Sequence, residues 1–202
     1  MIKIKTTDRY NITTLRSFMT NILCLLAALV VISIIFLIAG VNPIYAISEI
    51  FLGSFGSFYG IKETITKAIP LILIGTGLTL AFRAKFWNIG AEGQLLMGAI
   101  FATWTGLTFG EALPPYIIVP LIFLAGFIGG GLWGAIPAIL KIKYSINEVI
   151  STLMLNYICA EILTMLIVGP WKGKTRFGFP GTNNLPDSAI LGLIPGSRIH
   201  YA

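Results

Sequence analysis

The chain has 202 residues, of which 56% are hydrophobic and only 11% charged, and its formal net charge is +6. Soluble domains carry about 25% charged residues, so this composition excludes an ordinary soluble domain and predicts an all-α, polytopic integral membrane protein. The basic residues are scattered at the ends of apolar runs, which favours a role in membrane orientation over nucleic-acid binding.

Five membrane spans are predicted, at about residues 21–40, 66–82, 95–109, 116–140 and 147–168. The basic segment 1–20 precedes the first span, which is longer than the apolar core of a secretion signal and is therefore interpreted as retained. Residues 44–67 mix aromatic residues with glycines and predict a short interfacial helix or hairpin. Pro70 is expected near the start of the second span, where its missing N–H is tolerated.

The two last spans carry more specific signals. Three glycines of the fourth span recur every fourth residue and predict a small-residue face for close helix packing: Gly126, Gly130 and Gly134. Before the fifth span, Ser145 and Glu148 have the spacing of a capping box with Ser145 at the N-cap. Residues 169–202 are rich in Pro and Gly, which predicts an extracytoplasmic segment without a core of its own.

The basic residues near the membrane also predict the orientation. With the N-terminus inside, segment 1–20 and the short loops at 83–85 and 141–143 all place their Lys and Arg in the cytoplasm. The sequence therefore predicts a multi-pass protein of the plasma membrane with a cytoplasmic N-terminus.

The most informative stretch is the polar junction 83–94 between the second and third predicted spans. Three polar side chains lie there close to hydrocarbon: Asn88, Glu92 and Gln94. Two glycines permit a helix break or re-entrant turn: Gly90 and Gly93. An acid at such a place is costly unless it is paired or hydrated, and broken helices commonly line the path of transporters. We expect a broken segment on a substrate path; a polar loop at the membrane surface is the alternative.

A second polar stripe is predicted at the start of the fifth span. It consists of Asn147, Glu148, Thr152 and Asn156. Residues four apart on a helix share a face, so Thr152, Asn156 and roughly Glu148 are expected to point the same way.

The sequence offers no catalytic or metal-binding constellation. Cys24 and Cys159 lie inside apolar runs and are expected to be buried thiols, and the single histidine, His200, has no cysteine or acidic cluster nearby. The run 169–175 resembles a phosphate-binding loop, but its first glycine is one residue too close to its end and no strand precedes it. We therefore expect no metal, no cofactor and no enzymatic activity.

Three stretches together resemble a known family. They are FRAKFWNIGAEGQ at 82–94, GLWGAIPAILK at 131–141 and NEVISTLMLNYI at 147–158. They are similar to the permease subunits of ATP-binding-cassette (ABC) importers for simple sugars and nucleosides, in particular the nucleoside type that works with basic membrane lipoproteins. The resemblance extends in order from about residue 60 to the end of the chain.

The resemblance implies a nucleoside or sugar path shared with a second permease subunit, a separate cytoplasmic ABC ATPase that hydrolyses ATP, and an extracytoplasmic substrate-binding lipoprotein. It also implies that the junction 83–94 and the stripe 147–156 line the path. Because members of this family are longer and carry a further ATPase-docking segment, the chain is expected to be a truncated, N-terminal portion.

The residues leave two other functions open. The first is an ion-coupled secondary transporter or channel that uses Glu92 and Glu161 as proton sites. The second is a non-transporting membrane assembly subunit that binds a partner helix through the glycine face of the fourth span.

Overall fold

The computed structural model describes residues 14–173, 180–195 and 199–201. Most of the predicted N-terminal segment and the end of the 169–175 run lie outside these ranges. The elements are α1 Thr14–Ile38, α2 Pro43–Phe55, α3 Phe58–Arg83, α4 Ala91–Phe109, α5 Pro115–Tyr144, α6 Glu148–Val168 and the 3-10 helix η1 Asp187–Ala189. By length and composition, α1, α3, α5 and α6 are able to cross a membrane. The prediction of an all-helical, polytopic membrane protein is confirmed.

The chain divides into two compact units, residues 1–64 and 65–202. In the first unit, Asn42 caps α2, since its Oδ1 accepts hydrogen bonds from the N–H groups of Ile44 at 3.0 Å and Tyr45 at 3.4 Å. The start of α3 is tied to α2 by Thr64, whose Oγ1 donates to the Ser54 carbonyl at 3.1 Å. These local contacts explain why α2 stays short and turns directly into α3.

Helix α3 is longer than the span predicted at 66–82. The interfacial segment predicted at 44–67 is divided between α2 and the first turns of α3, and Pro70 lies well inside α3 instead of at its start. A proline removes one helical hydrogen bond, which membrane helices tolerate when local adjustments satisfy the freed group. The apolar run of α3 continues past Pro70, so the helix does too.

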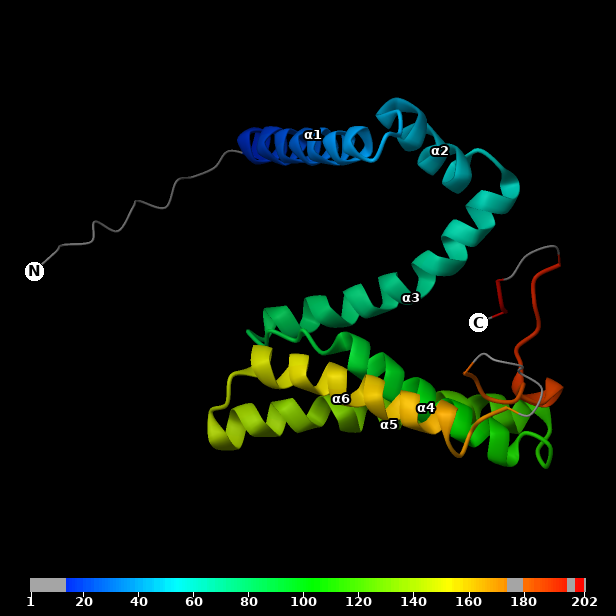
Figure 1. Cartoon of the computed structure of the whole chain (residues 1–202). Helices are drawn as coiled ribbons and strands as arrows, with labels where there is room; N and C mark the ends of the chain where they lie inside the picture. Colours follow the sequence, from blue (N-terminus) through cyan, green and yellow to red (C-terminus); the bar gives the residue numbers. More distant parts are fainter. Residues whose placement is uncertain (1–13, 174–179, 196–198, 202) are drawn as a thin grey trace, which may run out of the picture. The chain divides into compact units, whose positions relative to one another are not determined.

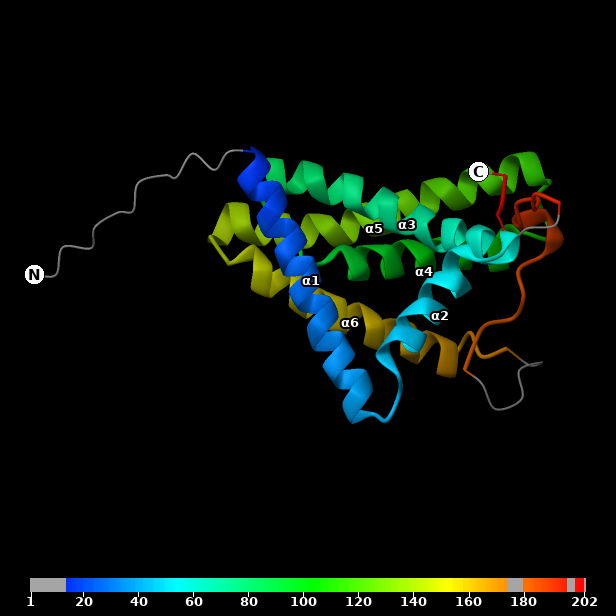
Figure 2. The ribbon, with the colours of Figure 1, turned by 90° about the horizontal axis from the view of Figure 1, so that it is seen from above.

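In the second unit, α4, α5 and α6 lie side by side (Figures 1 and 2). Helices α4 and α6 run in the same direction, because Gly90 and Gly93 face Thr152 and Asn156 in that order. Further along, the core between them contains Met97, Ile100 and Cys159. Of the two cysteines, Cys159 is buried as predicted, whereas Cys24 is exposed on α1 and the prediction of a buried thiol is wrong there.

Two helix starts differ from the sequence prediction. Helix α4 begins at Ala91, ahead of the predicted span 95–109, and its polar first turn keeps it out of the helices apolar enough to span. Helix α6 is capped by Asn147, whose Oδ1 accepts from the N–H of Val149 at 2.9 Å. The predicted capping box is wrong, because Ser145 adopts a left-handed conformation, φ 54°, that ends α5 and turns the chain toward α6.

The segment after α6 is mostly irregular where it is described. It contains η1, and Ala189 is buried. The hydroxyl of Ser188 donates to the carbonyl of Gly110, and a Cβ added to Gly106 would lie 2.7 Å from the Leu185 side chain. Part of the segment predicted to lack a core of its own therefore packs against the end of α4.

Candidate functional site

The segment between α3 and α4 leaves the helix and runs beside the start of α6. It turns at Lys85, which has a positive φ of 56°, and residues 86–90 have no regular secondary structure. Backbone groups that leave a helix need other partners, above all in an apolar environment. Side chains of α5 and α6 provide several of these partners.

Two side chains of α6 bind the backbone around the start of α4. Asn156 Oδ1 accepts from the Gly93 N–H at 2.8 Å, and its Nδ2 donates to the Ile89 carbonyl at 2.9 Å. Thr152, which is buried, accepts from the Ile89 N–H through Oγ1 at 3.2 Å. We call these two side chains and the backbone of residues 89–93 the polar seam. Two residues of the polar stripe predicted at 147–156 thus bind the polar junction predicted at 83–94.

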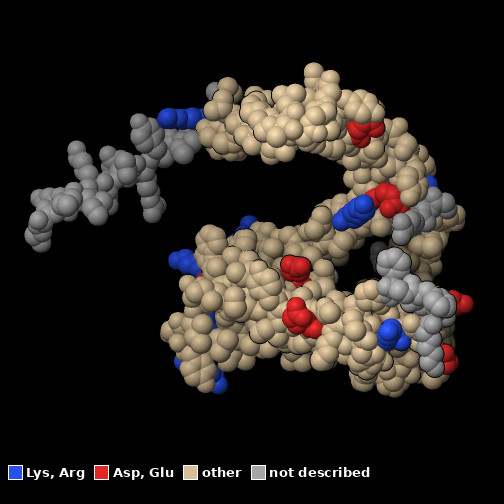
Figure 3. Space-filling view, in the orientation of Figure 1, with Lys and Arg blue, Asp and Glu red and all other residues tan. Residues whose placement is uncertain are grey.

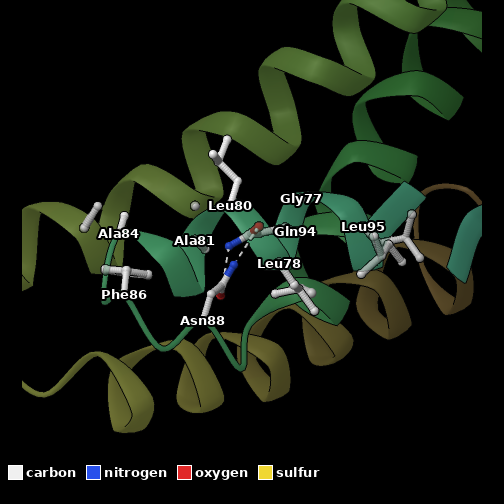
Figure 4. Close-up of a pocket in the computed structure, with 13 residues that line it drawn as sticks. Gly77, Leu78, Leu80, Ala81, Ala84, Phe86, Asn88, Gln94 and Leu95 are labelled. Atoms are coloured by element: carbon white, nitrogen blue, oxygen red, sulfur yellow. Dashed lines mark hydrogen bonds between the residues drawn. The ribbon is translucent and has the colours of Figure 1, made fainter. Parts of the chain in front are cut away.

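A pair of amides continues the polar seam toward α3 and α5. Asn88 Nδ2 donates to Gln94 Oε1 and Gln94 Nε2 donates to Asn88 Oδ1, both at 3.3 Å. Asn88 Oδ1 also accepts from the Gly90 N–H at 2.9 Å. Both side chains line a cavity of about 550 Å³ between α3, α4 and α5 (Figure 4).

The polar seam lies below the ends of the neighbouring helices. Asn156 is about 12 Å along α6 from its first residue, at 1.5 Å per residue. Gly134, which a Cβ would bring within 3.1 Å of Gln94 Nε2, lies about 15 Å before the end of α5. Helix α4 therefore begins well inside the apolar stretch of its neighbours, which is the geometry of a re-entrant segment.

The two predicted break glycines have different positions. Gly90 is buried directly before α4, and a Cβ there would lie 2.9 Å from the Thr152 Cβ. Gly93 lies inside the first turn of α4 and does not interrupt it; a Cβ there would lie 2.8 Å from Asn156 Oδ1. Gly93 therefore permits close packing of α4 against α6, and only Gly90 stands at the break.

Gly126, Gly130 and Gly134 of α5 face α4. A Cβ on Gly130 would lie 2.9 Å from the Gln94 carbonyl oxygen, and one on Gly98 of α4 would lie 2.9 Å from the Gly126 carbonyl oxygen. Gly134 leaves room for the side chain of Gln94. The small-residue face predicted for the fourth span thus lies at an intramolecular contact.

Glu148, which was expected on the substrate path, forms an ion pair with Lys141. Its Oε1 lies 2.5 Å from Lys141 Nζ, and Lys141 Nζ also donates to the Lys85 carbonyl at 3.0 Å. The Trp87 N–H approaches the same Oε1 at 3.4 Å. Sequence reasoning missed Lys141, because its place at a helix end indicated only a membrane anchor; we call Lys141 and Glu148 the latch pair.

The side chains of three other acidic or amide residues considered in the sequence do not take part in the polar seam. Glu92 is exposed and does not line the cavity beside Asn88 and Gln94. Asn147 caps α6, and Glu161 is exposed on α6. Figure 3 shows acidic side chains isolated on a largely uncharged surface over the α4 and α6 region, while Lys and Arg gather at one end of the helices.

Trp133 of α5 is a polar group that the sequence did not indicate. Its indole Nε1 is buried without a hydrogen-bond partner among the described residues, and a Cβ on Gly93 would lie 3.1 Å from it. An indole in an apolar helix gives no periodic signal, so only the structure could reveal it. In the described residues, no group of three His, Cys, Asp or Glu is placed to hold a metal ion.

The latch pair gives a testable prediction. Lys141→Met is expected to release Lys85 and Trp87, since one ammonium group holds both the Lys85 carbonyl and the Glu148 carboxylate. Trypsin cleavage after Lys85 in the purified protein in detergent should become severalfold faster. The reversed pair, Lys141→Glu with Glu148→Lys, should restore part of the protection, and Lys143→Met serves as the control at the same helix end. Equal cleavage rates in all variants would contradict the latch.

A bundle of apolar helices that holds a re-entrant segment by polar side chains defines a polytopic membrane protein of the transport class. The comparison with known families identifies the family within this class. The chain belongs to the family described as branched-chain amino acid transport system / permease component, whose model matches residues 60–189. This confirms the predicted resemblance to transporter permeases.

Individual relatives share the ABC permease description. The chain is 38% identical to a glucose ABC transporter permease protein of Haloferax volcanii, over 89% of this chain and 47% of the relative. It is 41% identical to a guanosine ABC transporter permease protein of Bacillus subtilis, over 67% of this chain and 38% of the relative. A nucleoside ABC transporter permease protein of Lactococcus lactis is 37% identical over 67% of this chain and 37% of its own length. The chain thus spans about half or less of these relatives, and no solved structure matches it.

Proposed function

We propose that the chain is a permease subunit of an ABC importer and forms part of the path for a nucleoside or simple sugar. It performs no covalent chemistry; a separate ATPase hydrolyses ATP. The family match and the printed names of the relatives support this class of transporter and cargo.

The partners follow from the same class. The chain would work with a cytoplasmic ABC ATPase, a second permease subunit and an extracytoplasmic substrate-binding lipoprotein, with its N-terminus in the cytoplasm. The Lys and Arg at 83–85 and 141–143 lie at the same end of the bundle, where Lys141 Nζ donates to the Lys85 carbonyl. This supports placing that end in the cytoplasm.

The polar seam is the observation that carries the proposal. The Asn156 amide, about 12 Å along α6, and the Thr152 hydroxyl, about 6 Å along it, bind the backbone of residues 89–93. Polar groups within an apolar layer are costly, and they are retained where a polar solute must pass. Asn88, Gln94, Thr152 and Asn156 are therefore the path residues that we propose; Glu92 contributes at the exposed edge.

The proposal is tested by uptake in cells that express the chain with its genomic partners. Uptake of a labelled nucleoside or glucose should stop when ATP is depleted and persist when a protonophore collapses the proton gradient, and an ATPase should co-purify with the chain. Uptake that follows the proton gradient alone would support an ion-coupled transporter. Stable co-purification without any uptake would support an assembly subunit.

A further inference from the structure

The cavity between α3, α4 and α5 has a simple chemical character. Of the 13 residues that line it, only Asn88 and Gln94 have polar side chains. The walls are apolar and include Leu78, Leu80 and Phe86. A solute in this cavity would meet one pair of side-chain amides and otherwise hydrocarbon.

The amide pair is not saturated. Each NH₂ group of Asn88 and Gln94 uses one of its two hydrogens in the reciprocal contact, and Gln94 Oε1 uses one of its two lone pairs. The two contacts are also longer, at 3.3 Å, than the hydrogen bonds of the polar seam, such as the 2.8 Å bond from the Gly93 N–H to Asn156. The pair can therefore offer donors and an acceptor side by side.

From this geometry we propose that the Asn88–Gln94 amide pair is the contact for the hydrogen-bonding edge of a planar nitrogen heterocycle, the base of a nucleoside or a free nucleobase. Such a ring presents a donor and an acceptor next to each other on one edge and two apolar faces. The edge matches the amides, and the faces match Leu78, Leu80 and Phe86. A hexose fits this cavity poorly, because its hydroxyl groups surround the ring and the apolar walls would leave most of them unpaired.

Gly134 supports this assignment. A Cβ at this position would lie 3.1 Å from Cδ and 3.1 Å from Nε2 of Gln94. Glycine therefore gives the Gln94 amide the space that its present position beside Asn88 requires. Asn88 is fixed from the other side, since its Oδ1 accepts from the Gly90 N–H.

The inference rests on the proposed function, and the test separates the two. In cells expressing the chain with its partners, we would measure uptake of labelled inosine, hypoxanthine and glucose. Gln94→Met keeps the length of the side chain and removes its hydrogen bonds. We expect it to raise the KM for the heterocyclic solute at least tenfold, whereas Thr79→Val, a polar-to-apolar change on α3 that does not line the cavity, should leave KM within twofold. Any partner that delivers the solute is identical in all strains.

Gly134→Ala provides a second variant, because it displaces the Gln94 amide without changing any polar group, and it should raise the same KM. The inosine and hypoxanthine arms distinguish a nucleoside from a free base. Glucose uptake in preference to both, or an unchanged KM in both variants, would overturn the inference while leaving an ABC permease in place. Absence of ATP-dependent uptake of all three solutes would overturn the proposed function and this inference together.

Discussion

Replacement of Asn156 by leucine should destabilise the packing of α4 against α6 and abolish most transport. The change keeps the approximate size of the side chain but leaves the Gly93 N–H and the Ile89 carbonyl without their partner. A buried polar group that loses its partner costs about 1–3 kcal/mol; the N–H of the buried Gly93 is such a group, and the Ile89 carbonyl, at an exposed contact, adds less. The measurement is thermal denaturation of the purified protein in detergent, together with uptake in cells.

A matched control is available on the same helix. Thr164 is exposed and its hydroxyl donates only to the Ala160 carbonyl one turn earlier, at 2.9 Å. Thr164→Val should therefore change the melting temperature little. If Asn156→Leu melted and transported like the wild type, the polar seam would have no energetic role.

Gly93→Ala is expected to be the most damaging single-methyl change at the site. The added Cβ would lie 2.8 Å from Asn156 Oδ1 and 3.1 Å from both Asn156 Cα and Trp133 Nε1. Because one of these atoms belongs to the α6 backbone, α4 and α6 must separate. Overpacking of this kind costs about 1–3 kcal/mol, and a lower melting temperature with reduced uptake should follow.

The control for this change is Gly131→Ala on α5, where an added Cβ meets nothing within 4 Å. Alanine has a higher helix propensity than glycine by about 1 kcal/mol, so this variant should be neutral or slightly stabilised. Opposite signs for the two substitutions would show that contact, and not helix propensity, sets the effect. A stabilised Gly93→Ala protein would contradict the packing shown here.

Much of the helical framework follows from hydrophobic runs alone. The apolar runs of α5 and α6 were predicted within a few residues, because long apolar segments have one stable form in a membrane. The end of α1 was also predicted, but its start lies at Thr14 and not at about residue 21. The start of α3 was predicted too late. Pro70 and the glycines before it indicated that the helix begins near Pro70, whereas it begins at Phe58 and continues through the proline. Local signals of this kind place breaks only approximately.

The sequence predicted most of the residues of the site, but it did not predict which of them bind each other. Four-residue spacing placed Thr152 and Asn156 on one face, and the polar junction indicated Asn88 and Gln94. Nothing local indicates that Asn156 binds the backbone at Ile89, 67 residues away in the chain. For the same reason Glu92 was given the central place, although it is exposed, and Lys141 was left out.

The depth at which α4 begins also has an electrostatic consequence. The N-terminus of a helix carries about half a positive elementary charge, and here that end lies inside the bundle. Glu92 occupies the first turn of α4, where a negative side chain is favoured by the helix dipole. The carboxylate therefore stabilises the first turn of α4 and more than offsets the partial positive charge of this helix end.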